Sequence, residues 1–217
     1  MKIIFIRHAE SIKNVEKRHG KAASIFGLTS KGVAETEILA RKILFKGSII
    51  DKIYASDSNQ ATETSKIFSN ILSVNTIVLE NFQSLDYGIV CGMSTDEIKK
   101  EYPEIQAQVD FFNLNKLHPK DFNIPSMETA LDFEKRINNA LSFIFDNSNN
   151  DSTVAVITHT SIINFAINIF NHFPLSITNG DFKRYNLPNL SFTIVKIDIN
   201  TRILVDIEIN KNHEAVS

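Results

Sequence analysis

The chain has 217 residues, of which 43% are hydrophobic and 22% are charged, and 23 Lys and Arg residues nearly balance 25 Asp and Glu residues. This composition is typical of a globular protein, and we expect residues 1–217 to form a single domain. The formal net charge of −2 gives no support to nucleic-acid binding or to a polybasic membrane surface, so we expect neither partner.

The single cysteine, Cys91, excludes an intrachain disulfide and a zinc site built from cysteines. No apolar run approaches the roughly 20 residues that span a bilayer. The first apolar run, from Ile3 to Ile6, is too short for a signal peptide and ends at Arg7. We therefore expect a cytoplasmic protein, present as a monomer or a homodimer.

Short apolar runs alternate with helical patterns along most of the chain. Strands are predicted at Lys2–Ile6, Lys52–Ala55, Thr76–Leu79 and Thr153–Thr158. Helices are predicted over residues 61–72, 127–144 and 161–170, where apolar residues recur at helical spacing or fill the segment. This alternation predicts a three-layer α/β/α sandwich with a mostly parallel central sheet.

The C-terminal part has a different pattern. Two runs of alternating residues over 190–210, joined at Asn200-Thr201, predict a β-hairpin. Two earlier stretches, Asn113–Ser126 and His172–Asn189, follow no clear period and are predicted to be loops. Long loops in compact domains often bind ligands, so we expect both to contact the substrate.

Two histidines each follow a predicted parallel strand: His8, preceded by Arg7 in "FIRHAES", and His159 in "TVAVITH". Because ligands bind at the carboxyl ends of such strands, we expect both histidines to share one crevice. A metal site is the first alternative, but neither an HExxH motif nor a clear third ligand accompanies them. No GxGxxG or GxxxxGK[ST] motif supports a nucleotide-binding module.

An ordered set of motifs resembles the histidine phosphatase superfamily, which includes the cofactor-dependent phosphoglycerate mutases. "FIRHAES", with Asn14 and Arg18 after it, is similar to the Arg-His-Gly signature of that family. The segments "GLTSKG", "IYASDSNQATETS", "LDYGIVCGMSTDEIKKEYPE", "SMET", "VAVITHTSII" and "LPNLSFTIVKID" resemble later family motifs. The resemblance runs nearly the full length. It implies a phosphoglycerate mutase-like fold and phosphate ester hydrolysis without a metal or another cofactor.

The resemblance also implies roles for individual residues. Arg7 is expected to bind a phosphate oxygen, and His8 to attack phosphorus and form a phosphohistidine that water hydrolyses. His159 is expected to donate to the phosphoryl oxygens, where charge accumulates in the transition state. Neighbouring positive charges oppose protonation of His8 and keep it nucleophilic. The other residues expected to assist substrate binding are Asn14, Arg18, Gln60, Ser84 and Thr160.

Two positions depart from the family pattern in ways that affect chemistry. Gln60 stands where a second phosphate-binding arginine is expected, so it can donate a hydrogen bond but has no charge. Ser84 stands where a catalytic glutamate is expected, and serine is too weak an acid to protonate an alkoxide leaving group. Asp86 is the candidate replacement acid, and Glu128 is expected to approach the substrate from its own loop. Arg18, Lys183 or Arg184 could restore the missing positive charge.

Two functions remain open. The first is a phosphatase for a phosphorylated small molecule or phosphohistidine, whose leaving group needs little protonation. The second is a catalytically impaired pseudophosphatase that binds a phosphorylated ligand or a protein. The retained pair His8 and His159 favours catalysis because a pure binder needs no nucleophile, whereas Gln60 and Ser84 favour binding alone. A mutase is less favoured because holding a bisphosphate needs more positive charge. We therefore expect a phosphatase.

Overall fold

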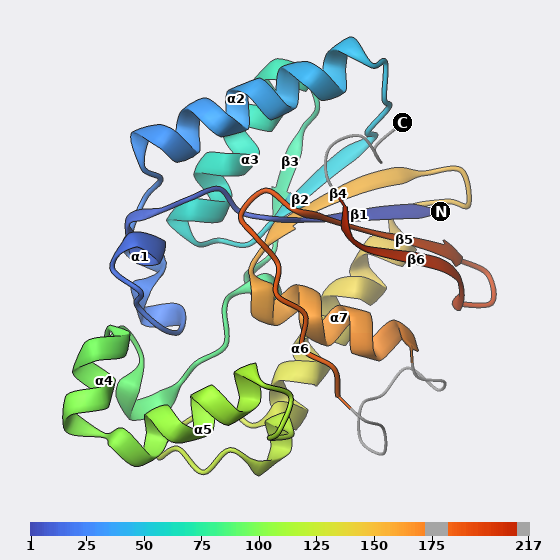
Figure 1. Cartoon of the computed structure of the whole chain (residues 1–217). Coiled ribbons are helices and arrows are strands. Elements are labelled where there is room, and N and C mark those ends of the chain that lie inside the picture. Colours follow the sequence, from blue (N-terminus) through green and yellow to red (C-terminus); the bar gives the residue numbers. More distant parts are fainter. Residues whose placement is uncertain (172–181, 212–217) are drawn as a thin grey trace.

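The computed structural model describes residues 1–171 and 182–211, which contain one six-stranded sheet (Figure 1). The strand order is β3-β2-β4-β1-β5-β6. Neighbours among the first four strands pair in parallel, whereas β5 pairs antiparallel with both β1 and β6. The strands are β1 (Lys2–Arg7), β2 (Lys52–Ala55), β3 (Thr76–Val78), β4 (Thr153–Thr158), β5 (Phe192–Asp198) and β6 (Ile203–Lys211).

Helices cover both faces of this sheet, which confirms the predicted three-layer α/β/α architecture. In the described part of the chain they are α1 (Ile12–Val15), α2 (Ser30–Phe45), α3 (Asn59–Leu72), α4 (Thr95–Glu101), α5 (Pro103–Asn113), α6 (Ala130–Asp146) and α7 (Thr160–Asn171). Helices α2 and α3 lie on one face and α6 and α7 on the other (Figure 1).

The alternation of side chains along β1 explains why both faces are covered. Ile4 and Ile6 belong to the core cluster under α2 and α3, whereas Ile3 and Phe5 belong to the cluster under α6 and α7. Successive strand residues point to opposite faces, so a strand that is apolar throughout must be buried on both. Each of these side chains is at most 1% exposed, which contributes about 1.5–3 kcal/mol per residue.

Helix boundaries depart from the sequence prediction where a hydroxyl caps the first turn. The helix predicted over 61–72 begins at Asn59, because the Ser58 side chain accepts a hydrogen bond from the Ala61 amide. The helix predicted over 127–144 begins at Ala130, because Thr129 caps the Asp132 amide in the same way. The predicted C-terminal hairpin is confirmed as β5 and β6.

In their described residues, the two predicted loops lie mostly outside helices and strands. Between Asn113, the last residue of α5, and Ser126 the structure has only a 3-10 turn at Pro119–Asp121. Of the second loop, residues 172–181 lie outside the described part, and residues 182–189 contain no helix or strand. Two asparagines of α7 hold this second segment through paired backbone bonds, Asn164 to Tyr185 (2.6 and 3.1 Å) and Asn168 to Lys183 (2.9 and 2.8 Å).

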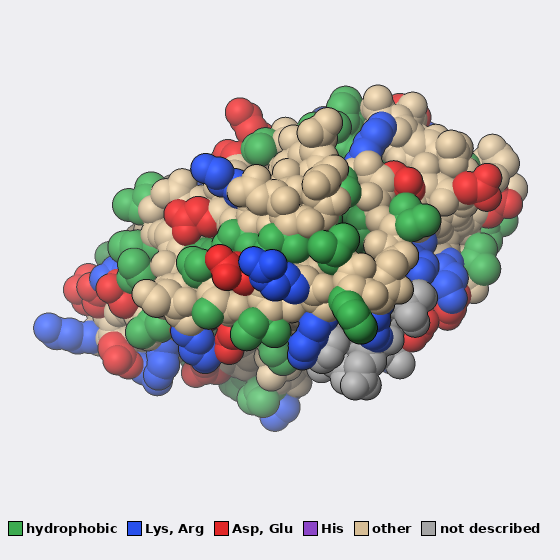
Figure 2. Space-filling model, turned by 90° about the horizontal axis from the view of Figure 1, so that it is seen from above, with side chains coloured by type: hydrophobic (Ala, Val, Ile, Leu, Met, Phe, Trp, Pro, Cys, Tyr) green, Lys and Arg blue, Asp and Glu red, His purple; other side chains and the backbone are tan. Residues whose placement is uncertain are grey.

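The outer surfaces show no segregation of charge on the face that Figure 2 presents. This view looks down on the top of Figure 1, over α2, and basic, acidic and apolar side chains are interspersed there. Within the described ranges, no helix is both long and apolar enough to cross a membrane.

Candidate active site

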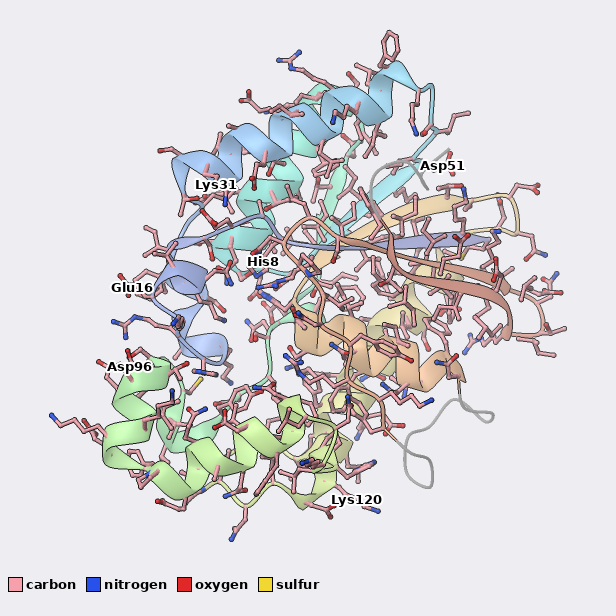
Figure 3. All side chains as sticks on the ribbon, viewed as in Figure 1. His8, Glu16, Lys31, Asp51, Asp96 and Lys120 are labelled. Carbon is pink, nitrogen blue, oxygen red and sulfur yellow. The ribbon has the colours of Figure 1, made fainter. Side chains whose placement is uncertain are left out.

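Two adjacent parallel strands bring the two predicted histidines to one edge of the sheet. Arg7 of β1 is in register with Thr158 of β4, and His8 and His159 are the next residues along each strand. Their ring centroids are 5.1 Å apart, and each side chain is only 3% exposed. Figure 3 shows His8 in the interior, between α1 and α7. The strand order has therefore placed both rings in one crevice.

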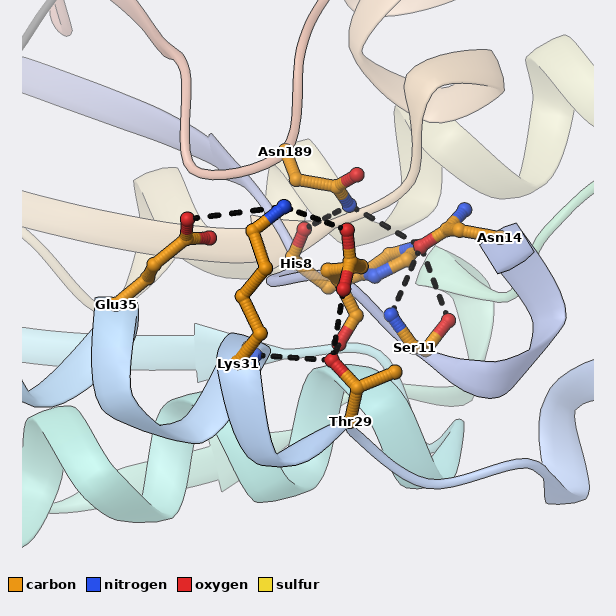
Figure 4. A network of polar contacts seen from close by, with 9 residues as sticks. His8, Ser11, Asn14, Thr29, Lys31, Glu35 and Asn189 are labelled. Carbon is orange, nitrogen blue, oxygen red and sulfur yellow. Dashed lines mark hydrogen bonds and ion pairs between the residues drawn. The ribbon is translucent and has the colours of Figure 1, made fainter.

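His8 is held as a neutral imidazole with one nitrogen available. Its Nδ1 lies 2.8 Å from the carbonyl oxygen of Ala9, which can only accept, so Nδ1 carries the proton and Nε2 keeps its lone pair. Asn189 donates to the His8 carbonyl at 2.7 Å and fixes this turn (Figure 4). Burial, and then the charges of Arg7 and Lys13, lower the pKa of His8 from 6.5 to about 3. The ring is therefore unprotonated at neutral pH.

His159 presents its other nitrogen. Its Nε2 lies 3.0 Å from the Ser56 hydroxyl and 3.2 Å from the Ser58 hydroxyl. When a serine hydroxyl donates to Nε2, the ring proton resides on Nδ1, which then serves as a donor. Burial, followed by the charge of His8, lowers the pKa of His159 well below its usual value. The sequence analysis did not predict this role for Ser56, which directly follows β2, or for Ser58, which caps α3.

Two cations are buried beside these histidines. Arg7 donates to the Leu187 carbonyl at 2.6 Å through Nη1, and its buried Nε has no protein partner. Lys13 is 8% exposed and donates to the Gly20 carbonyl at 2.6 Å. Burial lowers the pKa of Arg7 to about 10, with a further contribution from Arg184. Burial lowers that of Lys13 to about 8. Both remain protonated at neutral pH.

These groups line a cavity of about 240 Å³ that is rich in positive charge. Its cationic lining consists of Arg7, Lys13, Arg18 and Arg184. Among the described residues, no aspartate or glutamate lines it. A partly enclosed site that is lined by positive charges attracts an anion. Ser84 and Thr160, both expected to contact the substrate, lie in the same lining.

Asn14 also lines this cavity and is oriented by its neighbours (Figure 4). Its Oδ1 accepts from the Ser11 amide (3.1 Å), the Ser11 hydroxyl (3.0 Å) and Asn189 (3.2 Å), which leaves the NH₂ group to donate. Arg18 is at the rim, where its charge is shared with Glu16 at 2.5 Å and Glu97 at 3.4 Å. Asn14 is thus the better placed of the two to bind an anion.

Gln60 is not brought into the cavity. The side chain is fully buried and lies outside the lining, and its amide, oriented to donate, bonds the carbonyls of Ser24 (3.2 Å) and Phe26 (3.0 Å). The expectation that Gln60 binds substrate is therefore corrected: this amide fastens the segment around the 3-10 turn Lys21–Ile25. These two bonds satisfy an amide that is buried, where an unpaired donor would cost about 1–3 kcal/mol.

The two carboxylates expected near the substrate are also elsewhere. Asp86 pairs with Lys21 at 2.9 Å and accepts from the Gly88 amide at 3.0 Å. Burial alone would raise the pKa of Asp86, but these bonds outweigh it and lower the pKa, which disfavours the acid form. Glu128 forms a two-pronged pair with Arg136 at 2.6 and 2.9 Å. Neither carboxylate lines the cavity, and this corrects both expectations.

The sequence analysis missed Lys13 and Tyr87 and favoured a solvent-exposed loop position over the cavity entrance for His19, although all three line the cavity. A single lysine within a motif is normally expected to be solvent-exposed, and neither the periodicity nor the spacing of the sequence indicates that Lys13 is buried. Of the three basic residues expected to restore positive charge, Arg18 and Arg184 line the cavity and Lys183 does not. Among the residues that the structure describes, no group of three or more His, Cys, Asp or Glu side chains could hold a metal ion.

Comparisons with known proteins agree with this fold. The model of the histidine phosphatase superfamily (branch 1) matches residues 3–210. The structure of Bacillus stearothermophilus YhfR has a TM-score of 0.80 at 23% identity and covers 100% of this chain and 99% of its own. That of mycobacterial glucosyl-3-phosphoglycerate phosphatase Rv2419c has a TM-score of 0.74 at 16% identity, covering 97% and 99%. At these identities the likeness concerns the fold.

Similarity to curated sequences is confined to part of the chain. The fructose-2,6-bisphosphatase of Saccharomyces cerevisiae is 32% identical over 98 residues, which are 45% of this chain and 20% of that protein. The stretches matched to curated relatives span from 20% to 53% of those proteins. The activities of these relatives therefore describe those proteins and do not by themselves assign an activity to this chain.

Proposed function

The chain belongs to the histidine phosphatase superfamily, and we propose that it is a metal-independent phosphatase that forms a phosphohistidine on His8. Its substrate would be a phosphorylated small molecule or a phosphohistidine side chain. One observation carries this proposal: the Ala9 carbonyl holds the proton of His8 on Nδ1, so that Nε2 is free in a cavity lined by cations. A neutral imidazole nitrogen among positive charges is suited to attack an anionic phosphate ester.

The arrangement suggests how the chain would perform each step. Arg7, Lys13 and the NH₂ group of Asn14 would bind the phosphate oxygens, and His159 would donate from Nδ1 as negative charge grows on them. The Nε2 of His8 attacks phosphorus while the bond from phosphorus to the leaving oxygen breaks. Water then attacks the phosphohistidine, which releases inorganic phosphate and regenerates the neutral ring.

The direct test uses para-nitrophenyl phosphate, whose phenolate leaves without a proton, in the presence of EDTA. We expect the wild type to hydrolyse it and His8→Asn and His8→Ala to lose turnover while keeping the fold by circular dichroism. His118→Asn is the matched control, because His118 lies outside the cavity lining. Rapid acid-free quenching should trap a base-stable, acid-labile phosphoryl group on the wild type alone. Turnover that persists in both His8 variants, or that EDTA abolishes, would contradict the proposal.

The second candidate is a protein that binds a phosphorylated ligand without turnover. The observation in its favour is that no described carboxylate lines the cavity to protonate a leaving group. It predicts that inorganic phosphate binds to the wild type by calorimetry although no ester is hydrolysed. It also predicts that His8→Asn binds phosphate as well as the wild type does, because a pure binder makes no use of the nucleophile.

A further inference from the structure

The cavity needs a source of protons for any leaving group less acidic than a phenol. Ser84 occupies the position of the expected glutamate and lies in the lining, but a serine hydroxyl cannot supply that proton efficiently. Asp86 and Glu128 are both paired outside the cavity, with Lys21 and Arg136. The described lining therefore offers only cationic and neutral groups as proton donors.

We propose that Lys13 is the residue that protonates the leaving-group oxygen. This inference rests on the phosphatase function proposed above. The ammonium group has three N–H bonds, and the Gly20 carbonyl at 2.6 Å accepts only one of them. The remaining two belong to a side chain that is 92% buried and lines the same cavity as His8. They are the donors that this lysine can offer to a substrate.

Lys13 and the nucleophile come from different elements. Arg7 lies at the end of β1 and His8 directly follows it, whereas Lys13 lies on α1 and its ammonium donates to the carbonyl of Gly20, which lies beyond the end of α1. In an in-line displacement the leaving oxygen lies on the side of phosphorus away from the attacking nitrogen. Because Lys13 and His8 line the same cavity from different elements, the proposal assigns the Lys13 ammonium to that side of phosphorus. Gly20 fits this contact because it has φ +74°, and a Cβ there would meet Cys91 Sγ at 2.5 Å.

The other titratable groups in the lining are poorer donors. Burial raises the pKa of Tyr87 to about 12, so its hydroxyl holds its proton tightly. Burial and the charge of Lys13 lower the pKa of His19, which disfavours its protonated form at neutral pH. Arginines do not give up a proton near neutral pH, so Arg7 and Arg184 only bind. Among the described residues of the lining, Lys13 is the one that combines a proton at neutral pH with a readiness to release it.

Burial and charge explain this readiness. Burial lowers the pKa of Lys13 to about 8, and the charge of Arg7 acts in the same direction, whereas Cys91 opposes it. The same ammonium charge also lowers the pKa of His8 and of His159. General acids work best when their pKa lies near the working pH. An amine with this pKa is mostly protonated at neutral pH and returns to that form easily.

Every atom of the proposed step is accounted for. As Nε2 of His8 bonds to phosphorus, the ester P–O bond breaks and one Nζ–H proton of Lys13 moves to the departing oxygen, giving an alcohol and a neutral amine. The amine then takes a proton from the water that attacks the phosphohistidine. Inorganic phosphate leaves, His8 is free, and the ammonium group of Lys13 is restored.

The experiment compares two leaving groups in Lys13→Arg, which keeps the charge but cannot donate the proton. The substrates are para-nitrophenyl phosphate, which needs no proton, and benzyl phosphate, whose alkoxide does. We expect kcat for benzyl phosphate to fall about 100-fold, within the range of general acid catalysis, and the ratio of benzyl to nitrophenyl turnover to fall at least about tenfold. The wild-type decline in benzyl phosphate turnover above about pH 8 should also disappear. Lys66→Arg, at an exposed lysine of α3, is the matched control.

A second variant keeps the test decisive if arginine does not fit at this buried position. In Lys13→Ala, added ethylammonium should restore benzyl phosphate turnover and guanidinium should not. An unchanged leaving-group ratio in Lys13→Arg, or equal rescue by both cations, would overturn the assignment and leave Lys13 as a charge that binds phosphate. A wild type that hydrolyses neither ester while binding phosphate would overturn the proposed phosphatase function itself. The two failures are therefore distinguishable.

Discussion

Arg136 of α6 should be the most costly charged residue to remove near the site. Its guanidinium bonds both carboxylate oxygens of Glu128 at 2.6 and 2.9 Å, and it donates to the backbone carbonyls of Asn81 (2.8 Å), Gln83 (2.9 Å) and Ser84 (3.3 Å). It therefore anchors the segment whose Ser84 lines the cavity. Arg136→Met would leave a carboxylate and three carbonyls without this partner.

The size of the effect follows from burial. The Arg136 and Glu128 side chains are 19% and 17% exposed, so most of the pair is removed from water. Removing one partner of a buried pair costs about 3–5 kcal/mol. Because the pair keeps some exposure, we expect Arg136→Met to lose about 3 kcal/mol. Glu128→Gln leaves the three carbonyl bonds of Arg136 in place, so we expect a smaller loss, about 1.5 kcal/mol. The double variant should lose at least about 1 kcal/mol less than the sum, because no unpaired carboxylate remains.

Urea denaturation of the four proteins, with linear extrapolation to water, measures these differences. Lys135→Met is the matched control, since Lys135 is the exposed neighbour of Arg136 on the same helix. It should change the free energy of unfolding by no more than about 0.5 kcal/mol. A loss below about 1 kcal/mol in Arg136→Met, or losses in the two single variants that add fully, would refute the view that this pair is a buried anchor.

Three further predictions concern the turn at His8, a tight glycine and the misplaced glutamine. Burial lowers the pKa of His8 from 6.5 to about 3. At a pH between these two values, His8 therefore binds a proton in the unfolded chain but not in the folded chain. The free energy of unfolding should therefore fall as the pH drops below 6.5, and His8 should contribute up to about 1.4 kcal/mol per pH unit to this fall. In urea denaturation, His8→Asn should lose less stability between pH 7 and pH 5 than the wild type does. Equal losses in the two proteins would count against the pKa shift. Gly88 has φ +57°, and a Cβ there would overlap the Pro125 carbonyl, whereas Gly47 has φ +68° and a Cβ there would have no atom within 4 Å. Gly88→Ala should therefore lower Tm more than Gly47→Ala does. Equal losses of Tm would mean that the backbone angle alone sets the cost. Gln60→Leu should cost about 2 kcal/mol by leaving two carbonyls unpaired and should leave KM for para-nitrophenyl phosphate unchanged, whereas a raised KM would restore Gln60 to the substrate site.

The sequence predicted most of the fold because the fold depends on local periodicity. Short apolar runs located the four parallel strands, and alternation of apolar residues located the C-terminal hairpin. Two of the predicted helices begin at other residues than expected because Ser58 and Thr129 cap their first turns. The convergence of His8 and His159 was also predictable, since both directly follow strands that a parallel α/β sheet places side by side.

The polar partners of the site could not be predicted in this way. Whether a charged side chain faces the cavity or another residue depends on contacts between segments far apart in the chain. Arg7 is fixed by Leu187 across 180 positions, and Asp86 is removed from the site by Lys21. Reading roles from motif positions placed Gln60 in the site, because the motif records where a residue stands and not which groups it reaches.

One substitution pattern connects the two losses at positions 60 and 84 with Lys13. An arginine and a glutamate have separate duties, binding charge and giving a proton, and a buried lysine can perform both because its pKa falls on burial whereas that of arginine stays high. Lys13 and Arg184 line the cavity, and no described carboxylate there offsets their charges. This weakens the argument that the site has too little positive charge to bind a substrate with two anionic groups. The same surplus of charge opposes protonation of His8. The nucleophile is then neutral across the working range, and the upper pH limit of activity belongs to Lys13.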